Sequence, residues 1–192
     1  MKPDLRQLLM VAERLENSGI VYTLGGSGLL YRLGLTQTVR DWDLMTDAPK
    51  EAVMAALGSL PVEEITSGDY PYASQYKLLI HHEAPQVELI SRFAIYSEVG
   101  LCTLPLTADM SWQGVRVSSP EVWFVAYALM NRTEKAGLLL DYLRVYGVRH
   151  DVMRKLLAEP LPDDIVQVLQ ELMSLSPFDK NHRADEASST NR

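Results

Sequence analysis

Two aspartates separated by one residue are the strongest candidates for chemistry in this chain. Asp41 and Asp43 flank Trp42 in a short segment, 41–45, that alternates polar and apolar residues as a β-strand does. Residues two apart on a strand project to the same face, so the two carboxylates can hold one divalent cation between them. Carboxylate oxygens are the hard ligands that Mg²⁺ prefers, commonly together with phosphate oxygens. The pair therefore predicts a site for Mg²⁺ (or Mn²⁺) and a phosphorylated ligand.

A glycine turn precedes this pair and complements it. Gly25, Gly26 and Ser27 follow the β-branched run 20–24 and precede the apolar segment 29–33, which indicates the order strand, turn, helix. Glycines let backbone N–H groups approach phosphate oxygens at a helix N-terminus, and Ser27 adds a hydroxyl donor. The turn is needed because an acidic pair alone would repel a triphosphate.

Residues around the turn exclude three other glycine motifs. Leu29 stands where a nucleophile elbow needs its last glycine, and Tyr31 stands where a dinucleotide fingerprint needs its third. No Gly-Lys-Ser or Gly-Lys-Thr follows, so a P-loop is also excluded. The remaining pattern is a Gly-Ser turn, thirteen residues (28–40), and the Asp-x-Asp segment.

This pattern resembles the signature of the DNA polymerase β superfamily of nucleotidyltransferases. It is most similar to the minimal members, which include aminoglycoside-modifying and toxin–antitoxin proteins, and the resemblance covers about residues 20–95. It implies an α/β (α+β) nucleotidyltransferase fold with a mixed sheet flanked by helices. It also implies Mg²⁺-dependent transfer of a nucleoside monophosphate from an NTP, with ATP the first candidate, to an acceptor hydroxyl, with pyrophosphate leaving.

The resemblance further implies a third carboxylate on a later strand. Glu88, in the run 87–90, is the best match, although the family more often has aspartate there. Glu88 facing the aspartates can act as a general base on the acceptor hydroxyl or complete the metal site. Facing away, it is a solvated strand residue.

Basic residues near the expected strands are candidates for contact with the triphosphate. Arg40, Lys77 and Arg92 flank these strands, and surface ion pairs are the competing explanation for each. Lys135 resembles a phosphate-binding lysine of some relatives. The predicted nucleotide-binding set consists of Gly25, Gly26, Ser27, Arg40 and Lys77.

Two other interpretations stay open. A noncatalytic nucleotide-binding or antitoxin-like partner protein can keep the same fold, and the motif can also arise by chance on a structural domain. For an enzyme, a small hydroxylated molecule, a protein side chain and an RNA end all satisfy the metal chemistry. The net charge of −7 offers no broad basic surface for a nucleic-acid backbone, which favours a small molecule or a protein as acceptor.

The hydrophobic pattern divides the chain into two parts. Strands are expected at 20–24, 41–45, 62–65, 76–80 and 87–90, with helices at 5–19, 29–33 and 49–58. From about residue 118 the apolar spacing becomes helical, in 122–129, 139–146 and 165–172. We therefore expect a nucleotidyltransferase core at 1–117, a C-terminal helical region at 118–178, and a disordered tail at 179–192.

Composition sets the outer limits. The 192 residues are 47% hydrophobic, which suffices for one large domain and excludes wholesale disorder. The single cysteine, Cys102, cannot form an internal disulfide and is expected as a small buried side chain in a reducing compartment. A signal peptide and an apolar span of about 18–20 residues are both missing from the pattern, so we expect a soluble, cytoplasmic protein without a membrane partner.

Overall fold

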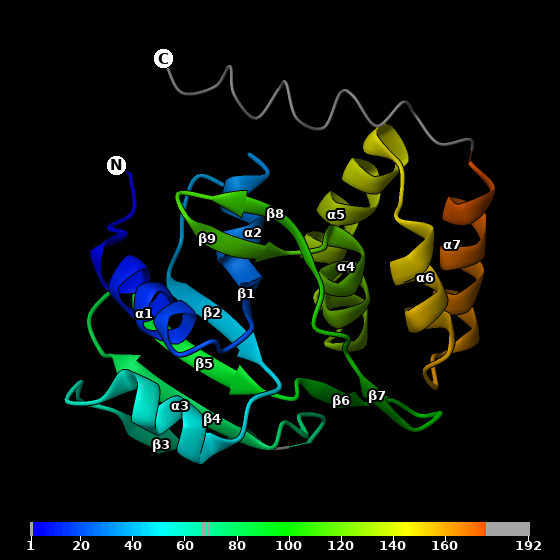
Figure 1. Ribbon diagram of the computed structural model, residues 1–192. Coiled ribbons are helices and arrows are strands. Elements are labelled where there is room, and N and C mark those ends of the chain that lie inside the picture. The colour runs from blue at the N-terminus through cyan, green and yellow to red at the C-terminus, as the bar shows by residue number, and fades with distance from the viewer. Residues whose placement is uncertain (1, 67, 69, 176–192) are drawn as a thin grey trace.

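The computed structural model describes residues 2–66, 68 and 70–175, so the tail expected at 179–192 lies outside the described residues. Seven strands form one sheet, and helices cover both of its faces (Figure 1). The strands are β1 (Tyr22–Leu24), β2 (Asp41–Thr46), β3 (Glu63–Ile65), β4 (Tyr76–His81), β5 (Gln86–Ser91), β8 (Ala108–Trp112) and β9 (Val115–Ser118). A separate hairpin consists of β6 (Ala94–Tyr96) and β7 (Leu101–Thr103).

The helices fall into two groups. Three lie among the strands in the sequence: α1 (Arg6–Asn17), α2 (Gly26–Arg32) and α3 (Lys50–Leu57). Four follow the last strand and gather at one side of the sheet in Figure 1: α4 (Pro120–Leu129), α5 (Thr133–Tyr146), α6 (His150–Leu157) and α7 (Asp163–Ser174). None of the described helices is long and apolar enough to cross a membrane.

The sheet is mixed, with the strand order β3-β4-β5-β2-β1-β9-β8. The pairs β2–β5 and β1–β9 are parallel, and the other neighbours are antiparallel. The strand with the predicted aspartates, β2, therefore lies near the middle, beside the strand that carries Glu88. The α/β (α+β) class with a mixed sheet, expected from the sequence, is confirmed.

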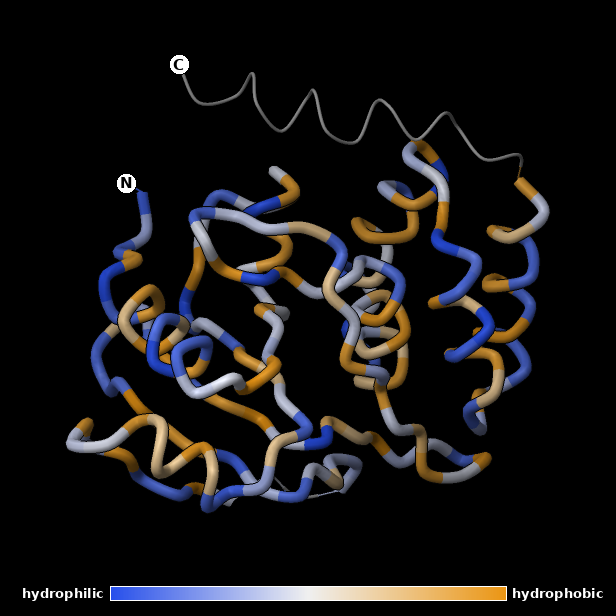
Figure 2. The backbone as a smooth tube through the Cα atoms, viewed as in Figure 1, coloured by the Kyte–Doolittle hydropathy of each residue, from blue (hydrophilic) through white to orange (hydrophobic). Residues whose placement is uncertain are grey.

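Two hydrophobic cores lie on opposite sides of the sheet. One packs α1 and α3 against inward side chains of the strands, among them Trp42 and Leu44 of β2. The other joins α2, the β6–β7 hairpin and helices α4 to α7, and it includes the buried Cys102. Figure 2 shows α4 coloured as hydrophobic along most of its length, in keeping with the burial of every residue from Pro120 to Tyr127.

Alternation along β2 sends successive residues to opposite faces. Trp42 and Leu44 are fully buried in the first core, whereas Asp41 and Asp43 keep partial exposure on the other face. The indole N–H of Trp42 donates to the backbone carbonyl of Asp4, which ties the start of the chain to this strand. The packing of Trp42 and Leu44 thus fixes the strand that presents Asp41 and Asp43 on its opposite face.

Several elements differ from the expected ones. Helix α2 begins at Gly26 rather than at residue 29, so most of the glycine turn is the first turn of the helix. Four strands between residues 94 and 118 and the short helix α6 were not predicted. These strands have only three to five residues each, which leaves too few positions for alternation to be recognised.

Candidate active site

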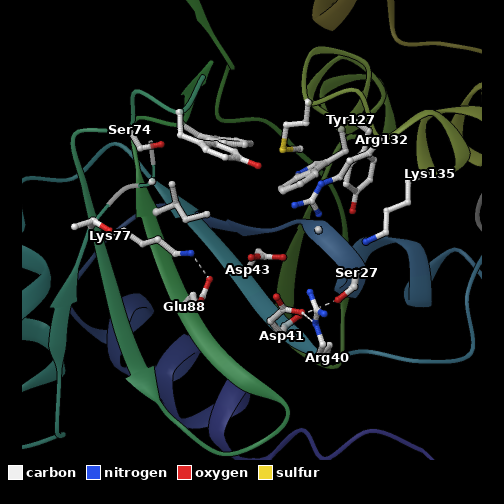
Figure 3. Close-up of a pocket in the computed structure, with 18 residues that line it drawn as sticks. Ser27, Arg40, Asp41, Asp43, Ser74, Lys77, Glu88, Tyr127, Arg132 and Lys135 are labelled. Carbon is white, nitrogen blue, oxygen red and sulfur yellow. Dashed lines mark hydrogen bonds and ion pairs between the residues drawn. The ribbon is translucent and has the colours of Figure 1, made fainter. Parts of the chain in front are cut away.

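Three carboxylates meet on the face of the sheet opposite α1 and α3. Asp41 and Asp43 lie on β2 and Glu88 on β5, and the parallel register places Asp43 directly opposite Glu88. One carboxylate oxygen from each residue lies within 4.8 Å of the other two. The three residues predicted as catalytic and metal-binding residues thus form one cluster, which we call the acidic wall (Figure 3).

The acidic wall lines a pocket of about 260 Å³. Of the residues predicted to bind nucleotide, Gly26, Ser27, Arg40 and Lys77 also line it, and Gly25 does not. The pocket is therefore the place where most of the predicted site residues come together.

The glycine turn is locked to β2 by hydrogen bonds. The N–H of Gly25 donates to the carbonyl of Asp43 at 2.8 Å, and the Ser27 hydroxyl donates to the carbonyl of Asp41 at 2.9 Å. These two bonds fix the turn beside the carboxylates. The second bond engages the Ser27 hydroxyl proton that the sequence offered to phosphate, so the Ser27 side chain has no hydroxyl proton left to donate to a ligand.

The two glycines of this turn are required for different reasons. Gly26 has a φ of +55°, and a Cβ at this position would overlap the Asp43 carboxylate. A Cβ at Gly25 would overlap the indole ring of Trp123 from α4. Gly26 therefore makes room for the acidic wall, while Gly25 makes room for the helical region to pack against the turn.

The predicted basic residues occupy different places. Lys77 of β4 forms an ion pair with Glu88, with Nζ 2.6 Å from Oε2, inside the pocket. Arg40 lies at the pocket edge, largely exposed, with its Nε 3.6 Å from an Asp41 oxygen. Arg92 is exposed and is not among the lining residues.

Helices α4 and α5 supply the opposite side of the pocket. Tyr127, Arg132 and Lys135 line it from this side, and we call these three the basic wall (Figure 3). Lys135 Nζ lies 5.3 Å from the centre of the Tyr127 ring, a cation–π arrangement that holds the ammonium over the pocket. The buried Tyr127 hydroxyl has no hydrogen-bond partner among the described residues.

Sequence reasoning missed most of this second wall. Lys135 is among the sequence candidates, but Tyr127 lies within the segment 122–129, whose apolar spacing predicts only helix packing, and Arg132 lies in the short connection between α4 and α5. No local spacing signals that these residues face the β2 aspartates, because the contact is made across the fold.

The charges on each wall affect the pKa of a group on the other wall. Burial, followed by the charges of Asp41 and Glu88, raises the pKa of Asp43 to about 7, while Lys77 and Lys135 oppose the rise. Burial also raises the pKa of Tyr127, and Asp43 adds to the effect. Tyr127 therefore stays a neutral hydroxyl that can donate a hydrogen bond into the pocket.

The donor set fits a divalent metal ion. All three groups are carboxylates and their oxygens converge. Burial, followed by the charges of Asp41 and Glu88, raises the pKa of Asp43, and a bound cation would oppose both effects. Asp41 and Asp43, which have no lysine partner at ion-pair distance among the described residues, are the residues best placed to hold such an ion.

Comparison with solved structures identifies the fold. A Thermotoga maritima protein assigned as a nucleotidyltransferase is 23% identical, with a TM-score of 0.54 over 73% of this chain and 92% of that chain. The solution structure of the antibiotic-resistance factor ANT(2'')-Ia is 17% identical, with a TM-score of 0.50 over 85% of this chain and 87% of that chain. The chain has the nucleotidyltransferase fold. No protein-family model and no curated protein sequence matches it.

Proposed function

We propose that this protein transfers a nucleoside monophosphate from an NTP to a hydroxyl group, with Mg²⁺ (or Mn²⁺) as cofactor. The observation that carries the proposal is the convergence of Asp41, Asp43 and Glu88 in a pocket that also holds the glycine turn. The fold supports it, because the pocket lies on the strands that carry the predicted signature. ATP is the first candidate for the NTP, and a cytoplasmic location stays a prediction from the sequence.

Each wall has a distinct task in this proposal. Asp41 and Asp43 would hold the metal ion, which when bound neutralises the triphosphate and polarises the α-phosphate. Gly26 and Ser27 line the pocket in the first turn of α2, where backbone N–H groups have no partner within the helix and would be available to phosphate oxygens. Lys135 and Arg132 approach from the opposite side and add two positive charges, so the anionic ligand lies between the two walls.

The transfer itself requires one proton movement. The acceptor oxygen forms a bond to the α-phosphorus, and the bond from that phosphorus to the bridging oxygen breaks, so that pyrophosphate leaves. The acceptor hydroxyl gives its proton to a base in the pocket, and Glu88 is the candidate because it lies opposite Asp43 at the pocket surface. A small molecule or a protein side chain is preferred as acceptor over nucleic acid, given the charge of −7.

A second candidate function is nucleotide binding without transfer. The ion pair between Lys77 and Glu88 favours it, because this contact neutralises the carboxylate that would take the proton. In that case the protein would keep Mg²⁺·NTP affinity and have no turnover.

A labelling experiment distinguishes the two functions. Each of the four NTPs, labelled at the α- or at the γ-phosphate, is incubated with Mg²⁺ and fractions of a cell lysate. A nucleotidyltransferase moves the α-label to an acceptor and releases the γ-label as pyrophosphate. Binding of Mg²⁺·NTP without transfer to any fraction would support the noncatalytic protein, and transfer of the γ-label would contradict both candidates.

The Glu88→Gln variant tests the role of the third carboxylate in the same assay. If Glu88 takes the proton, the transfer rate falls by about 10²–10⁴-fold, the usual range for general-base catalysis, while most of the Mg²⁺·NTP affinity remains. Unchanged transfer would remove Glu88 from the mechanism and leave the rest of the proposed function intact.

A further inference from the structure

The Lys77–Glu88 ion pair places a fixed positive charge inside the acidic wall. Nζ of Lys77 lies 2.6 Å from Oε2 of Glu88, and the two side chains are 23% and 13% exposed. Figure 3 shows the lysine reaching from its strand to Glu88, beside Asp43. Its charge also acts on Asp43, opposing the rise in pKa of that carboxyl. In a pair this short and this sheltered from water, the attraction between the charges is stronger than in an exposed pair, and removing either partner leaves an uncompensated charge.

The sheet register explains why the lysine reaches this carboxylate. Leu79 of β4 pairs with Glu88, and Lys77 pairs with Ile90, two residues further along β5. Lys77 is therefore a diagonal neighbour of Glu88 on the same face, a distance that long side chains span. Glutamate extends one methylene further than the aspartate that the resembling family more often has here, which suits contact with the neighbouring strand.

The ion pair divides the acidic wall into two unequal parts. Glu88 has the sheltered Lys77 ammonium at contact distance, whereas the nearest cation to Asp41 is the largely exposed Arg40 guanidinium at 3.6 Å, which a divalent ion can displace into water. A second divalent ion about 3.5–4 Å from the first would need Glu88 as a ligand and would meet the ammonium of Lys77 at close range. Two cations so close together repel each other strongly in a site sheltered from water.

We propose that the loaded site holds a single divalent cation, carried by Asp41 and Asp43, and that the Lys77 ammonium replaces a second one at Glu88. This inference rests on the proposed function, since it concerns the same site with its nucleotide bound. In this proposal the Lys77 ammonium neutralises part of the negative charge of the acidic wall. The sequence, by contrast, suggested that Lys77 contacts the triphosphate.

Counting metal ions tests this directly and does not depend on turnover. The protein is dialysed to equilibrium with Mn²⁺ and the nonhydrolysable α,β-methylene analogue of each NTP in turn, and retained Mn²⁺ and nucleotide are both measured. We expect one Mn²⁺ per bound nucleotide in the wild type. The Lys77→Met variant frees Glu88, so the ratio should rise to two.

A matched control is available in a second Lys–Glu ion pair. Lys50 Nζ lies 3.0 Å from Glu64 Oε2, and neither residue lines the pocket. Lys50→Met should leave the ratio at one. The double variant Lys77→Met/Glu88→Gln should return the ratio from two to one, because the extra ion loses its ligand. Lys77→Gln, which keeps a hydrogen-bonding side chain, should also give two and serves if the methionine variant does not fold.

The outcomes separate this inference from the proposed function. Two Mn²⁺ per nucleotide in the wild type, or a ratio of one in a folded Lys77→Met or Lys77→Gln variant, overturns the single-ion site while leaving the proposed function in place. Retention of none of the four analogues by the wild type overturns the proposed function and this inference with it.

Discussion

The two walls of the pocket are built in opposite ways. The acidic wall comes from two adjacent parallel strands, and the register alone brings Asp43 opposite Glu88. The residues of the basic wall, from Tyr127 on, lie more than 80 residues further along the chain than β2, and they reach the pocket through packing of α4 against the glycine turn. The acidic wall can therefore be recognised from local spacing, whereas the basic wall exists only in the folded protein.

This comparison also assigns different roles to the walls. On the acidic wall, burial and the charges of neighbouring carboxylates disfavour the ionised form of Asp43 and raise its pKa, and a bound cation would favour that form. Cations and a neutral hydroxyl on the other side favour an anion without a metal. We expect changes in the acidic wall to have larger effects than changes in the basic wall, because only the former would remove the metal ion.

Apart from the Glu88→Gln variant, the largest effect is expected from Asp43→Asn. Removing one of the two proposed metal ligands should lower the transfer rate by about 10²–10³-fold, since a bound metal ion contributes several kcal/mol of charge stabilisation. Steady-state transfer assays with the labelled NTP provide the measurement. Asp47→Asn, an exposed aspartate just beyond β2, is the control and should keep the wild-type rate. Equal losses in both variants would argue against a special role for Asp43.

A methyl group at the glycine turn should act through the acidic wall. Gly26→Ala places its Cβ against the Asp43 carboxylate, and the residue must also keep a φ of +55°. We expect Mg²⁺·NTP binding to weaken by about 1–3 kcal/mol, measured by calorimetry. Gly19→Ala is the matched control, because Gly19 has a similar φ of +69° and nothing within 4 Å of the added Cβ. If the two variants bind NTP equally well, the turn acts only as a connector.

The pH dependence of stability should report the burial of Asp43 and its repulsion by the other two carboxylates. The pKa of Asp43 is raised from 3.8 to about 7, so between these pH values the folded state holds a proton that the unfolded state has lost. This contribution to stability is therefore fully present below about pH 4, falls as the pH rises, and is gone above about pH 7. Asp43→Asn removes this dependence and should raise the free energy of unfolding by up to about 4 kcal/mol at pH 8.

Urea denaturation across this pH range, with EDTA present, provides the measurement. Asp47→Asn should keep the wild-type slope. The assignment would be contradicted if the free energy of unfolding rises more in the wild type than in the Asp43→Asn variant between pH 4 and pH 7.

The smallest effect is expected in the basic wall. Lys135→Met should weaken Mg²⁺·NTP binding by about tenfold, the lower range for one charge-assisted hydrogen bond, with little change in the amount of metal bound. Lys155→Met, on the exposed side of α6, is the control. An effect as large as that of Asp43→Asn would remove the proposed difference between the walls.

Much of the site follows from sequence because its key spacings are local. Alternation around Asp41 and Asp43 predicts their shared face, and the apolar run around Glu88 predicts the neighbouring strand. The pairing of those two strands is not local, and neither is the ion pair of Lys77, which depends on the diagonal register between β4 and β5. Gly25 shows the same limit, since its packing against Trp123 of α4 has no signal in the surrounding residues.

The most direct test of the central claim is the metal dependence of nucleotide binding to the acidic wall. Isothermal titration of the wild type with a nonhydrolysable NTP analogue should show binding that requires Mg²⁺ and is lost with EDTA. The Asp41→Asn/Asp43→Asn variant, shown to be folded by circular dichroism, should lose this Mg²⁺ dependence together with most of the affinity. Unchanged Mg²⁺-dependent binding in the folded double variant would contradict the assignment of the two aspartates.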